Sequence, residues 1–395
     1  MISFDEAFAI IAARAKPLGA ETVPVAAAYG RILAEAVTAL VDSPPADVSA
    51  MDGYAVRDAE VAGGARRFRI VGQSFAGAGF AGKAGAGACV RIFTGAPLPE
   101  GFDRVVIQED VAREGDFASI VEPVSASRHV RPRGSDFKAG DTLLEAGRIV
   151  HSRAVVAAAG ADRAELVVWR RPRLAIIGTG DELAAPGEAR ARPGSIPESL
   201  SLGIAALAQE WGGETIACHR LPDDLARIAA AAAEALGQAD LVVVTGGASV
   251  GEKDYAKEAF ASCGLELLFS KVAIKPGKPV WFGCAEGTLV VGLPGNPTSA
   301  MVTGRLLLAP LVAGLGGRDP LEAARWRPAR LACDIEPCGD RETFARARWN
   351  GDAVQPLANQ DSGAQRTLAD AELLIRRRPR APALGQGEMA EVIDL

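Results

Sequence analysis

Strands and helices alternate between residues 173 and 311, and this alternation restricts the fold more than any other feature of the chain. Short apolar runs are separated by segments of about ten to fifteen residues with helical spacing of their apolar side chains. The predicted strands are Arg173–Ile177, Glu214–Cys218, Asp240–Thr245 and Leu289–Gly292, and the predicted helices are Ser199–Trp211, Asp223–Leu236, Asp254–Ser262 and Thr298–Leu311. Such alternation forms βαβ units with parallel neighbouring strands. The pattern therefore predicts a doubly wound, mostly parallel α/β domain.

Polar residues gather directly after each predicted strand of this domain. The four segments that follow the strands contain Gly or Pro together with acids or hydroxyls, and the opposite strand ends do not; these segments are Gly178–Glu182, Pro222–Asp224, Thr245–Asp254 and Leu293–Ser299. In an open α/β sheet, ligands bind beyond the carboxyl ends of the strands. We therefore predict a ligand crevice at this edge.

Two of these segments are suited to bind an anion. Gly246-Gly247 and Gly295-Asn296 each precede a predicted helix, where backbone N–H groups and the helix dipole attract negative charge. Nearby in the chain, Lys275-Pro276-Gly277-Lys278 places two cations on a stiff turn. This combination favours a phosphate or another oxyanion as ligand.

The same edge carries four carboxylates, Glu182, Asp223, Asp224 and Asp254. Carboxylates that share a cation with a phosphate are the usual ligands of Mg²⁺. Phosphate chemistry with a divalent ion is the function that these residue types favour. Helix capping and turn formation are the alternative for each loop taken alone.

Charge and cysteine content exclude several classes of protein. The chain has 43 Lys and Arg against 49 Asp and Glu, a net charge of −6, so we expect no nucleic-acid partner. The chain contains no uninterrupted apolar stretch of about 18 residues, so we expect no membrane partner. The six cysteines form no C-x-x-C pair and the N-terminus is acidic, so a cytoplasmic location is predicted. With only three isolated histidines, a histidine-based triad or metal site is not expected.

The rest of the chain divides into three further stretches. Ser3-x-x-Glu6 is a capping box that predicts an N-terminal helix, and residues 139–166 return to helix-compatible sequence. Between them the sequence is β-rich, and after residue 318 it again indicates short strands with Pro and Gly turns, typical of a small barrel. In that last stretch we expect Arg376–Arg378 to be a solvated strand end. The expected domains are residues 1–45 with 138–168 (discontinuous helical/mixed), 46–137 (β-rich), 169–317 (α/β) and 318–395 (β-barrel-like).

Six ordered motifs carry a resemblance to a known family. They are Ser49–Val56, Phe93–Gly101, Thr179–Leu183, Thr245–Asp254, Lys275–Pro279 and Gly292–Pro297. Together they resemble the molybdopterin molybdenumtransferase family, the bacterial relatives of the gephyrin C-terminal domain, over essentially the whole chain.

The resemblance implies an L-shaped, four-domain subunit that works as a homodimer, with a cleft between the α/β domain of one subunit and the β-rich domain of the other. It also implies the reaction. Adenylylated molybdopterin and molybdate are the substrates, the pyrophosphate is cleaved in a Mg²⁺-dependent step, and AMP and molybdenum cofactor are released.

Carried over position by position, the resemblance implies roles for residues of both domains. The catalytic positions are Asp52, Thr94, Glu182, Asp254, Lys275 and Lys278. The metal positions are Glu182, Asp254 and one of Asp223 and Asp224. Molybdate is expected at Lys275, Ser299, Arg346 and Ser362, and the further substrate-binding positions are Asp136, Gly246, Gly247, Ser249, Pro294, Gly295, Asn296 and Pro297.

One segment departs from the family pattern. Where the family usually has Ile, an aromatic or polar residue, an acid, Ser or Thr and then Asn, this chain has Ile196-Pro197-Glu198-Ser199-Leu200. Glu198 keeps the acid, whereas Leu200 loses the amide. This change keeps open the alternative of a non-catalytic molybdopterin-binding or scaffold paralogue. The α/β domain alone also resembles a molybdopterin adenylyltransferase, which acts one step earlier, so this third alternative stays open as well.

Overall fold

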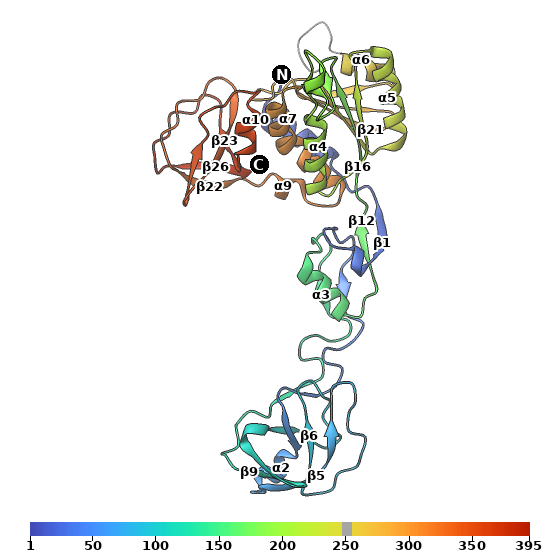
Figure 1. Cartoon of the computed structure of the whole chain (residues 1–395), viewed down its shortest axis with the longest axis vertical. Helices are drawn as coiled ribbons and strands as arrows, with labels where there is room; N and C mark the ends of the chain where they lie inside the picture. The colour runs from blue at the N-terminus through green and yellow to red at the C-terminus, as the bar shows by residue number, and fades with distance from the viewer. Residues whose placement is uncertain (247–254) are drawn as a thin grey trace.

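The computed structural model of the chain describes residues 1–246 and 255–395. The molecule is elongated, with a β-rich unit at one end and an α/β unit beside a C-terminal barrel at the other (Figure 1). A small connecting unit joins the two ends. The predicted fold class, an α/β domain with β-rich, mixed and barrel-like companions, is confirmed.

The α/β unit is built on a six-stranded sheet of order β16-β13-β17-β21-β20-β18. Its strands are β13 (Arg173–Thr179), β16 (Glu214–Leu221), β17 (Leu241–Thr245), β18 (Glu266–Phe269), β20 (Trp281–Ala285) and β21 (Thr288–Leu293). The four predicted strands pair in parallel, as expected, and their strongly apolar members are buried on both faces. The antiparallel edge formed by β20 and β18 was not predicted.

Helices cover both faces of this sheet. They are α4 (Leu200–Glu210), α5 (Leu225–Gln238), α6 (Tyr255–Ala261) and the run of α7 (Pro297–Thr303), the π-helical η4 (Gly304–Leu308) and α8 (Ala309–Leu315). Two separate apolar clusters lie against the sheet, one with α4, α7 and α8 and one with α5 and α6. The predicted N-terminal helix is α1 (Phe4–Arg14), closed by the Ser3–Glu6 capping box, and it packs on α8.

One helical run in the described part of the chain, Pro297–Leu315, is long and apolar enough to cross a bilayer. In the structure 94% of that run is buried inside the protein. This is the position of a core helix.

The C-terminal strands close into a five-stranded barrel. Its order is β23-β24-β22-β26-β25, and β25 pairs back with β23. The strands are β22 (Arg327–Leu331), β23 (Glu342–Asn350), β24 (Ala353–Pro356), β25 (Leu373–Arg377) and β26 (Met389–Asp394); β19 (Ile274–Lys275) adds to β23, and α9 (Pro320–Ala323) and α10 (Gln365–Ala369) flank the barrel. Pro328 lies within β22, where it pairs with Glu391 of β26.

The expectation of a solvated arginine run was wrong for Arg376 and Arg377, whereas Arg378 is exposed as expected. Arg376 and Arg377 lie in β25 and are only 7% and 4% exposed. Arg376 pairs with Glu342 of β23 and with Asp5 of α1, so the buried cation has two carboxylate partners. Both partners are distant from Arg376 in the sequence, so the charge run alone could not indicate that this arginine is buried in an ion pair.

The β-rich and connecting units complete the chain. The β-rich sheet has the order β7-β4-β6-β5-β9-β8. Its elements are β4 (Gly53–Val56), α2 (Asp58–Ala62), β5 (Arg67–Ser74), β6 (Ala88–Ile92), β7 (Arg104–Ile107), η2 (Gln108–Asp110), β8 (Val111–Glu114) and β9 (Phe117–Ile120). The remaining elements before β13 are β1 (Ala20–Pro24), η1 (Val25–Ala27), β2 (Val37–Thr38), β3 (Val48–Ser49), β10 (Val130–Arg131), β11 (Thr142–Leu144), α3 (Ser152–Gly160) and β12 (Glu165–Trp169). In the α/β unit, β13 is followed by β14 (Leu183–Ala184), η3 (Ala189–Ala191) and β15 (Ile196–Pro197). Because β1 pairs with β12, β2 with β11 and β3 with β10, the chain enters and leaves the β-rich unit along paired strands.

Candidate functional site

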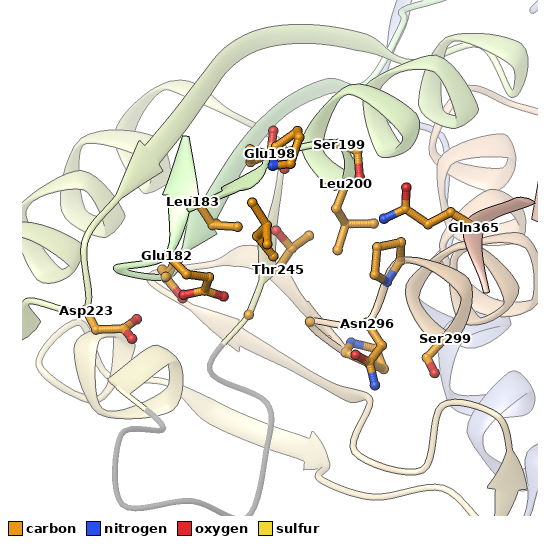
Figure 2. A pocket seen from close by; sticks show the side chains of 18 of the residues that line it. Glu182, Leu183, Glu198, Ser199, Leu200, Asp223, Thr245, Asn296, Ser299 and Gln365 are labelled. Atoms are coloured by element: carbon orange, nitrogen blue, oxygen red, sulfur yellow. The ribbon is translucent and has the colours of Figure 1, made fainter. Parts of the chain in front are cut away.

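A cavity of about 520 Å³ lies at the carboxyl ends of β13, β17 and β21 (Figure 2). It is lined by Thr179, Gly180, Glu182, Leu183, Ile196, Pro197, Glu198, Ser199, Leu200, Asp223, Thr245, Gly246, Pro279, Pro294, Gly295, Asn296, Pro297, Ser299 and Gln365. All four segments that the sequence places after the parallel strands therefore contribute to one cavity.

Two glycines allow the strand ends to converge. Gly246 has a φ of +87°, and a Cβ there would lie 2.4 Å from the carbonyl oxygen of Thr179 at the end of β13. The backbone of Gly246 is also the nearest neighbour of Gly295, whose added Cβ would meet the Gly246 Cα at 3.4 Å. Only glycine combines this dihedral with so close an approach. The three loops thus form one continuous wall.

Two of the predicted carboxylates, those of Glu182 and Asp223, face the same end of the cavity (Figure 2). The carboxylate of Glu182 lies against the backbone of Gly180, where an added Cβ would be 2.7 Å from Oε2. Asp224 instead caps α5, because its Oδ1 accepts the N–H of Arg227 at 3.0 Å. Of the two adjacent aspartates, Asp223 is therefore the one placed to bind a ligand.

Three predicted site residues, Gly247, Ser249 and Asp254, lie outside the described residues. Within residues 1–246 and 255–395, no group of three or more His, Cys, Asp or Glu side chains is arranged to hold a metal ion. Glu182 and Asp223 are hard oxygen donors, which suit Mg²⁺, but two carboxylates leave most of its coordination to other ligands. Substrate phosphate oxygens and water would have to supply them.

The opposite end of the cavity is formed by the loop after β21 and by the barrel. Asn296 donates from Nδ2 to the hydroxyl of Ser362 at 3.2 Å, which joins these two parts of the chain. Ser299, at the beginning of α7, and Gln365, at the beginning of α10, line this end (Figure 2). The sequence did not point to Gln365, because no periodicity or spacing relates α10 to the strand ends.

Arg346 lies behind this end of the cavity and is fully buried. Its Nη2 donates to the carbonyl of Asp361 at 3.0 Å, and its Nη1 lies 3.5 Å from both the carbonyl of Ala364 and the hydroxyl of Thr298. Burial lowers the pKa of its guanidinium. Nε has no hydrogen-bond partner among the described atoms. In this chain Arg346 therefore holds the 361–364 segment in place, and it does not line the cavity.

The predicted lysine pair lies near the cavity without lining it. Lys275 and Lys278 are both exposed, whereas Pro279, the next residue, does line the cavity. Their predicted roles in anion binding stay predictions.

The remaining predicted residues lie in other units of the chain. In the β-rich unit, Oδ1 of Asp52 accepts both the backbone N–H and the hydroxyl of Thr94, each at 2.7 Å. Asp136 is exposed, and its N–H donates to the carbonyl of Ser43 at 3.0 Å. The β-rich unit is at the opposite end of the molecule from the α/β unit (Figure 1). One chain alone therefore does not bring Asp52 and Thr94 to the cavity.

Comparison with known proteins accounts for nearly the whole chain. Residues 2–161 match the "MoeA N-terminal region (domain I and II)", residues 175–314 a "Probable molybdopterin binding domain", and residues 328–395 the "MoeA C-terminal region (domain IV)". The molybdopterin molybdenumtransferase 2 of Mycobacterium tuberculosis is 36% identical over 393 residues, which is 95% of each chain. The chain belongs to the molybdopterin molybdenumtransferase family. It is therefore an enzyme of molybdenum cofactor biosynthesis.

Other members of the molybdopterin molybdenumtransferase family agree with this. The Haemophilus influenzae molybdopterin molybdenumtransferase is 37% identical over 306 residues, which is 76% of this chain and 74% of that protein. The crystal structure of the molybdopterin biosynthesis MoeA protein from Pyrococcus horikoshii OT3 superimposes with a TM-score of 0.83 at 26% identity, over all of both chains. The resemblance predicted from the six motifs is confirmed.

The segment that departs from the family pattern lies in the cavity wall. All five residues from Ile196 to Leu200 line the cavity. Glu198 is only 8% exposed, and its Oε1 accepts the N–H of Ser201 at 2.7 Å, so it caps the N-terminus of α4. Leu200, at the start of α4, presents an apolar side chain where the resemblance leads us to expect an amide.

The Asp52–Thr94 contact gives a prediction about ionisation. The N–H and then the hydroxyl of Thr94 hold the pKa of Asp52 below its ordinary value, because both hydrogen bonds favour the carboxylate. In Thr94→Val the N–H remains and the hydroxyl is lost, so the pKa of Asp52 should rise and its protonation begin at higher pH. An NMR titration of the carboxyl carbon measures this change.

The matched controls are a second variant and a second carboxylate. Thr94→Ser keeps a hydroxyl and should leave the pKa of Asp52 where it is. The pKa of Asp58, in the same unit, is lowered chiefly by its hydrogen bond to Arg104 and should not move in either variant. An Asp52 titration curve unchanged in Thr94→Val would show that the hydroxyl does not stabilise the charge.

Proposed function

We propose that this enzyme inserts molybdenum from molybdate into adenylylated molybdopterin and releases AMP, in a Mg²⁺-dependent reaction of a cytoplasmic homodimer. One observation carries the proposal. A single cavity brings together the carboxylates of Glu182 and Asp223, the backbone of two glycine loops and a hydroxyl-bearing helix start. A metal-bound pyrophosphate and a tetrahedral oxyanion are ligands that need these groups.

We assign the two ends of the cavity to different parts of the substrates. Glu182 and Asp223 would hold Mg²⁺ together with oxygens of the pyrophosphate. When bound, the ion would neutralise charge on the phosphates and polarise the bond that breaks. The backbone N–H groups around Gly246 and Gly295 would bind phosphate oxygens, because neither glycine has a side chain to keep a phosphate away from its backbone.

Molybdate is placed at the other end, near Ser299 and Ser362. The hydroxyl of Ser299 lines the cavity, and Ser362 is held at its rim by Asn296. Lys275 would reach this end from solvent to neutralise the dianion, while Arg346 would act by holding the 361–364 segment. In the proposed reaction an oxygen of molybdate forms a bond to the adenylate phosphorus. The bond from that phosphorus to the bridging oxygen of the pyrophosphate breaks, which leaves molybdopterin phosphate and an adenylyl-molybdate anhydride. The two thiolate sulfurs of molybdopterin then bind the molybdenum, the Mo–O bond of the anhydride breaks, and AMP leaves with the transferred oxygen.

A second copy of the chain would complete the site. Asp52 and Thr94 form a preorganised pair on a unit that one chain holds away from its own cavity. In a symmetric dimer the β-rich unit of one subunit can lie over the α/β cavity of the other. We therefore propose that Asp52, Thr94 and Asp136 act on the cavity of the partner.

The reaction is tested with purified protein, adenylylated molybdopterin, molybdate and Mg²⁺. We expect AMP release that requires all three additions and falls at least about 100-fold in Glu182→Gln, because that variant loses a metal ligand and a charge in the cavity. Wild-type protein without the metal, after dialysis against a chelator, should lose activity and regain it when Mg²⁺ is restored.

Two other outcomes would replace the proposal. Binding of adenylylated molybdopterin without AMP release above background would identify a non-catalytic or scaffold paralogue, as the changed 196–200 segment could produce. Consumption of ATP in the presence of molybdopterin would identify an adenylyltransferase.

A further inference from the structure

A second cavity, of about 370 Å³, lies at the opposite end of α4 from the functional cavity. The N-terminus of α4 lines the functional cavity at Leu200, and its C-terminus lines the second cavity at Gln209 and Glu210. The second cavity is bounded by the end of α4, the end of α8 and the connecting unit. Its lining includes Tyr29, Arg31, Trp169, Arg171, Trp211 and Arg318.

Positive charge in this cavity exceeds the negative charge that faces it. Three arginines line it against one acid, Glu210. Arg31 is already paired, because its Nη2 donates to Glu21 and, at 2.8 Å, to the carbonyl of Trp169. The side chains of Arg171 and Arg318, both half-buried, make no hydrogen bond or ion pair with any residue of the described part of the chain.

Trp211 brings a second cation close to Arg318. The guanidinium carbons of Arg305 and Arg318 both lie 4.7 Å from the centre of the Trp211 ring. Arg305 is used elsewhere, since its Nε and Nη1 donate to the carbonyls of Asp394 and Ala323. Arg318 is therefore held in a partly desolvated place, next to a like charge, and the ring is its only partner among residues 1–246 and 255–395.

The electrostatics of both arginines agree with this arrangement. Burial lowers the pKa of Arg318. Burial, and to a smaller extent the neighbouring Arg318, lower the pKa of Arg305 to about 10, although Asp394 and Glu210 act in the opposite direction. A partly buried cation without a counter-charge is unfavourable, and an anion beside it removes that penalty.

We propose that this cavity binds a small-molecule oxyanion, a phosphate or a carboxylate, between Arg171 and Arg318. Two guanidinium groups can each present paired N–H donors to such a group, a geometry that lysine cannot supply. The aromatic rings of Trp169 and Tyr29 in the same lining would contact an apolar part of the ligand. The site is separate from the proposed catalytic residues and does not depend on the function assigned to them.

Tryptophan fluorescence gives a local readout of this site. Trp169 and Trp211 line the second cavity, and no tryptophan lines the functional one. Inorganic phosphate, and in a separate arm acetate, are titrated into the full-length protein with chloride used to keep the ionic strength constant. We expect a saturable change in emission with at least one of them, and the arm that saturates at lower concentration identifies phosphate or carboxylate as the preferred class.

Variants localise the response. In Arg171→Gln/Arg318→Gln the apparent affinity should fall at least about ten-fold, because two charge-assisted contacts are lost. Arg153→Gln, which removes one positive charge from the exposed face of α3, should bind like the wild type. Arg171→Lys/Arg318→Lys keeps the charge and should lie between them, which also covers the case in which the glutamine variant does not fold.

Three results would overturn the proposal. The first is a change in emission that does not saturate with either phosphate or acetate. The second is a saturable change with the same apparent affinity in the double glutamine variant and in Arg153→Gln. The third is a double variant that changes the sedimentation of the protein while neither anion has an effect, which would make the cavity a contact between subunits.

Discussion

Mixing Asp52→Asn protein with Glu182→Gln protein should restore AMP release to about a quarter of the wild-type rate, although each variant alone should be reduced by at least about 100-fold. Asp52 lies in the β-rich unit and Glu182 at the cavity of the α/β unit, at opposite ends of one chain. If each cavity is completed by the partner, half of the randomly mixed dimers contain one intact site and one doubly altered site. A quarter of all sites is then intact.

The matched control places both changes on the same unit. Glu182 and Asp223 line the same cavity, so mixing Glu182→Gln with Asp223→Asn leaves every site with one altered α/β unit. This mixture should stay inactive. AMP release is measured on the unfractionated mixtures. Differently tagged chains, recovered through both tags from a sample of each mixture, show that subunits have exchanged in both experiments. Rescue no greater than in the control would contradict a cavity shared between subunits and leave Asp52 without the proposed role.

Much of the fold could be predicted because it follows from local pattern. The four parallel strands are continuous apolar runs buried on both faces, and the helices between them have clear periodicity and caps such as Asp224. The antiparallel strands β18 and β20 could not be predicted in the same way. β20 carries Gly283, where an added Cβ would lie 2.6 Å from the carbonyl of Glu266, so the close approach of two strands selects a residue that weakens the strand signal.

The residues of the candidate site also fall into those that local pattern predicts and those that depend on tertiary packing. Residues that follow the strands, such as Glu182, Gly246 and Ser299, were predicted because the carboxyl ends of parallel strands must share one edge. Gln365 and the buried position of Arg346 could not be predicted, since they depend on where the barrel packs against that edge. Choosing Asp223 over Asp224 also needs coordinates, because either of two adjacent aspartates can cap a helix.

Gly246→Ala should abolish most of the activity by displacing one strand end from another. Alanine at a φ of +87° is strained, and its Cβ would lie 2.4 Å from the carbonyl oxygen of Thr179, well inside van der Waals contact. The loops after β13 and β17 must then separate, and a misplacement of about 1 Å in a catalytic site can lower the rate about 100-fold. We expect AMP release to fall by at least that factor and the free energy of unfolding to drop by about 1–3 kcal/mol.

Two glycine variants show whether the close approach is responsible. Gly295→Ala adds a Cβ to the same wall at an ordinary distance, 3.4 Å from the Cα of Gly246, and without a positive φ. It should reduce AMP release far less. Gly237→Ala, near the end of α5, meets no atom within 4 Å and should raise the stability slightly without changing activity. If Gly246→Ala were as active as Gly295→Ala, the contact between the ends of β13 and β17 would not be needed for catalysis, and the wall that these loops form would have to bind substrate without being rigid.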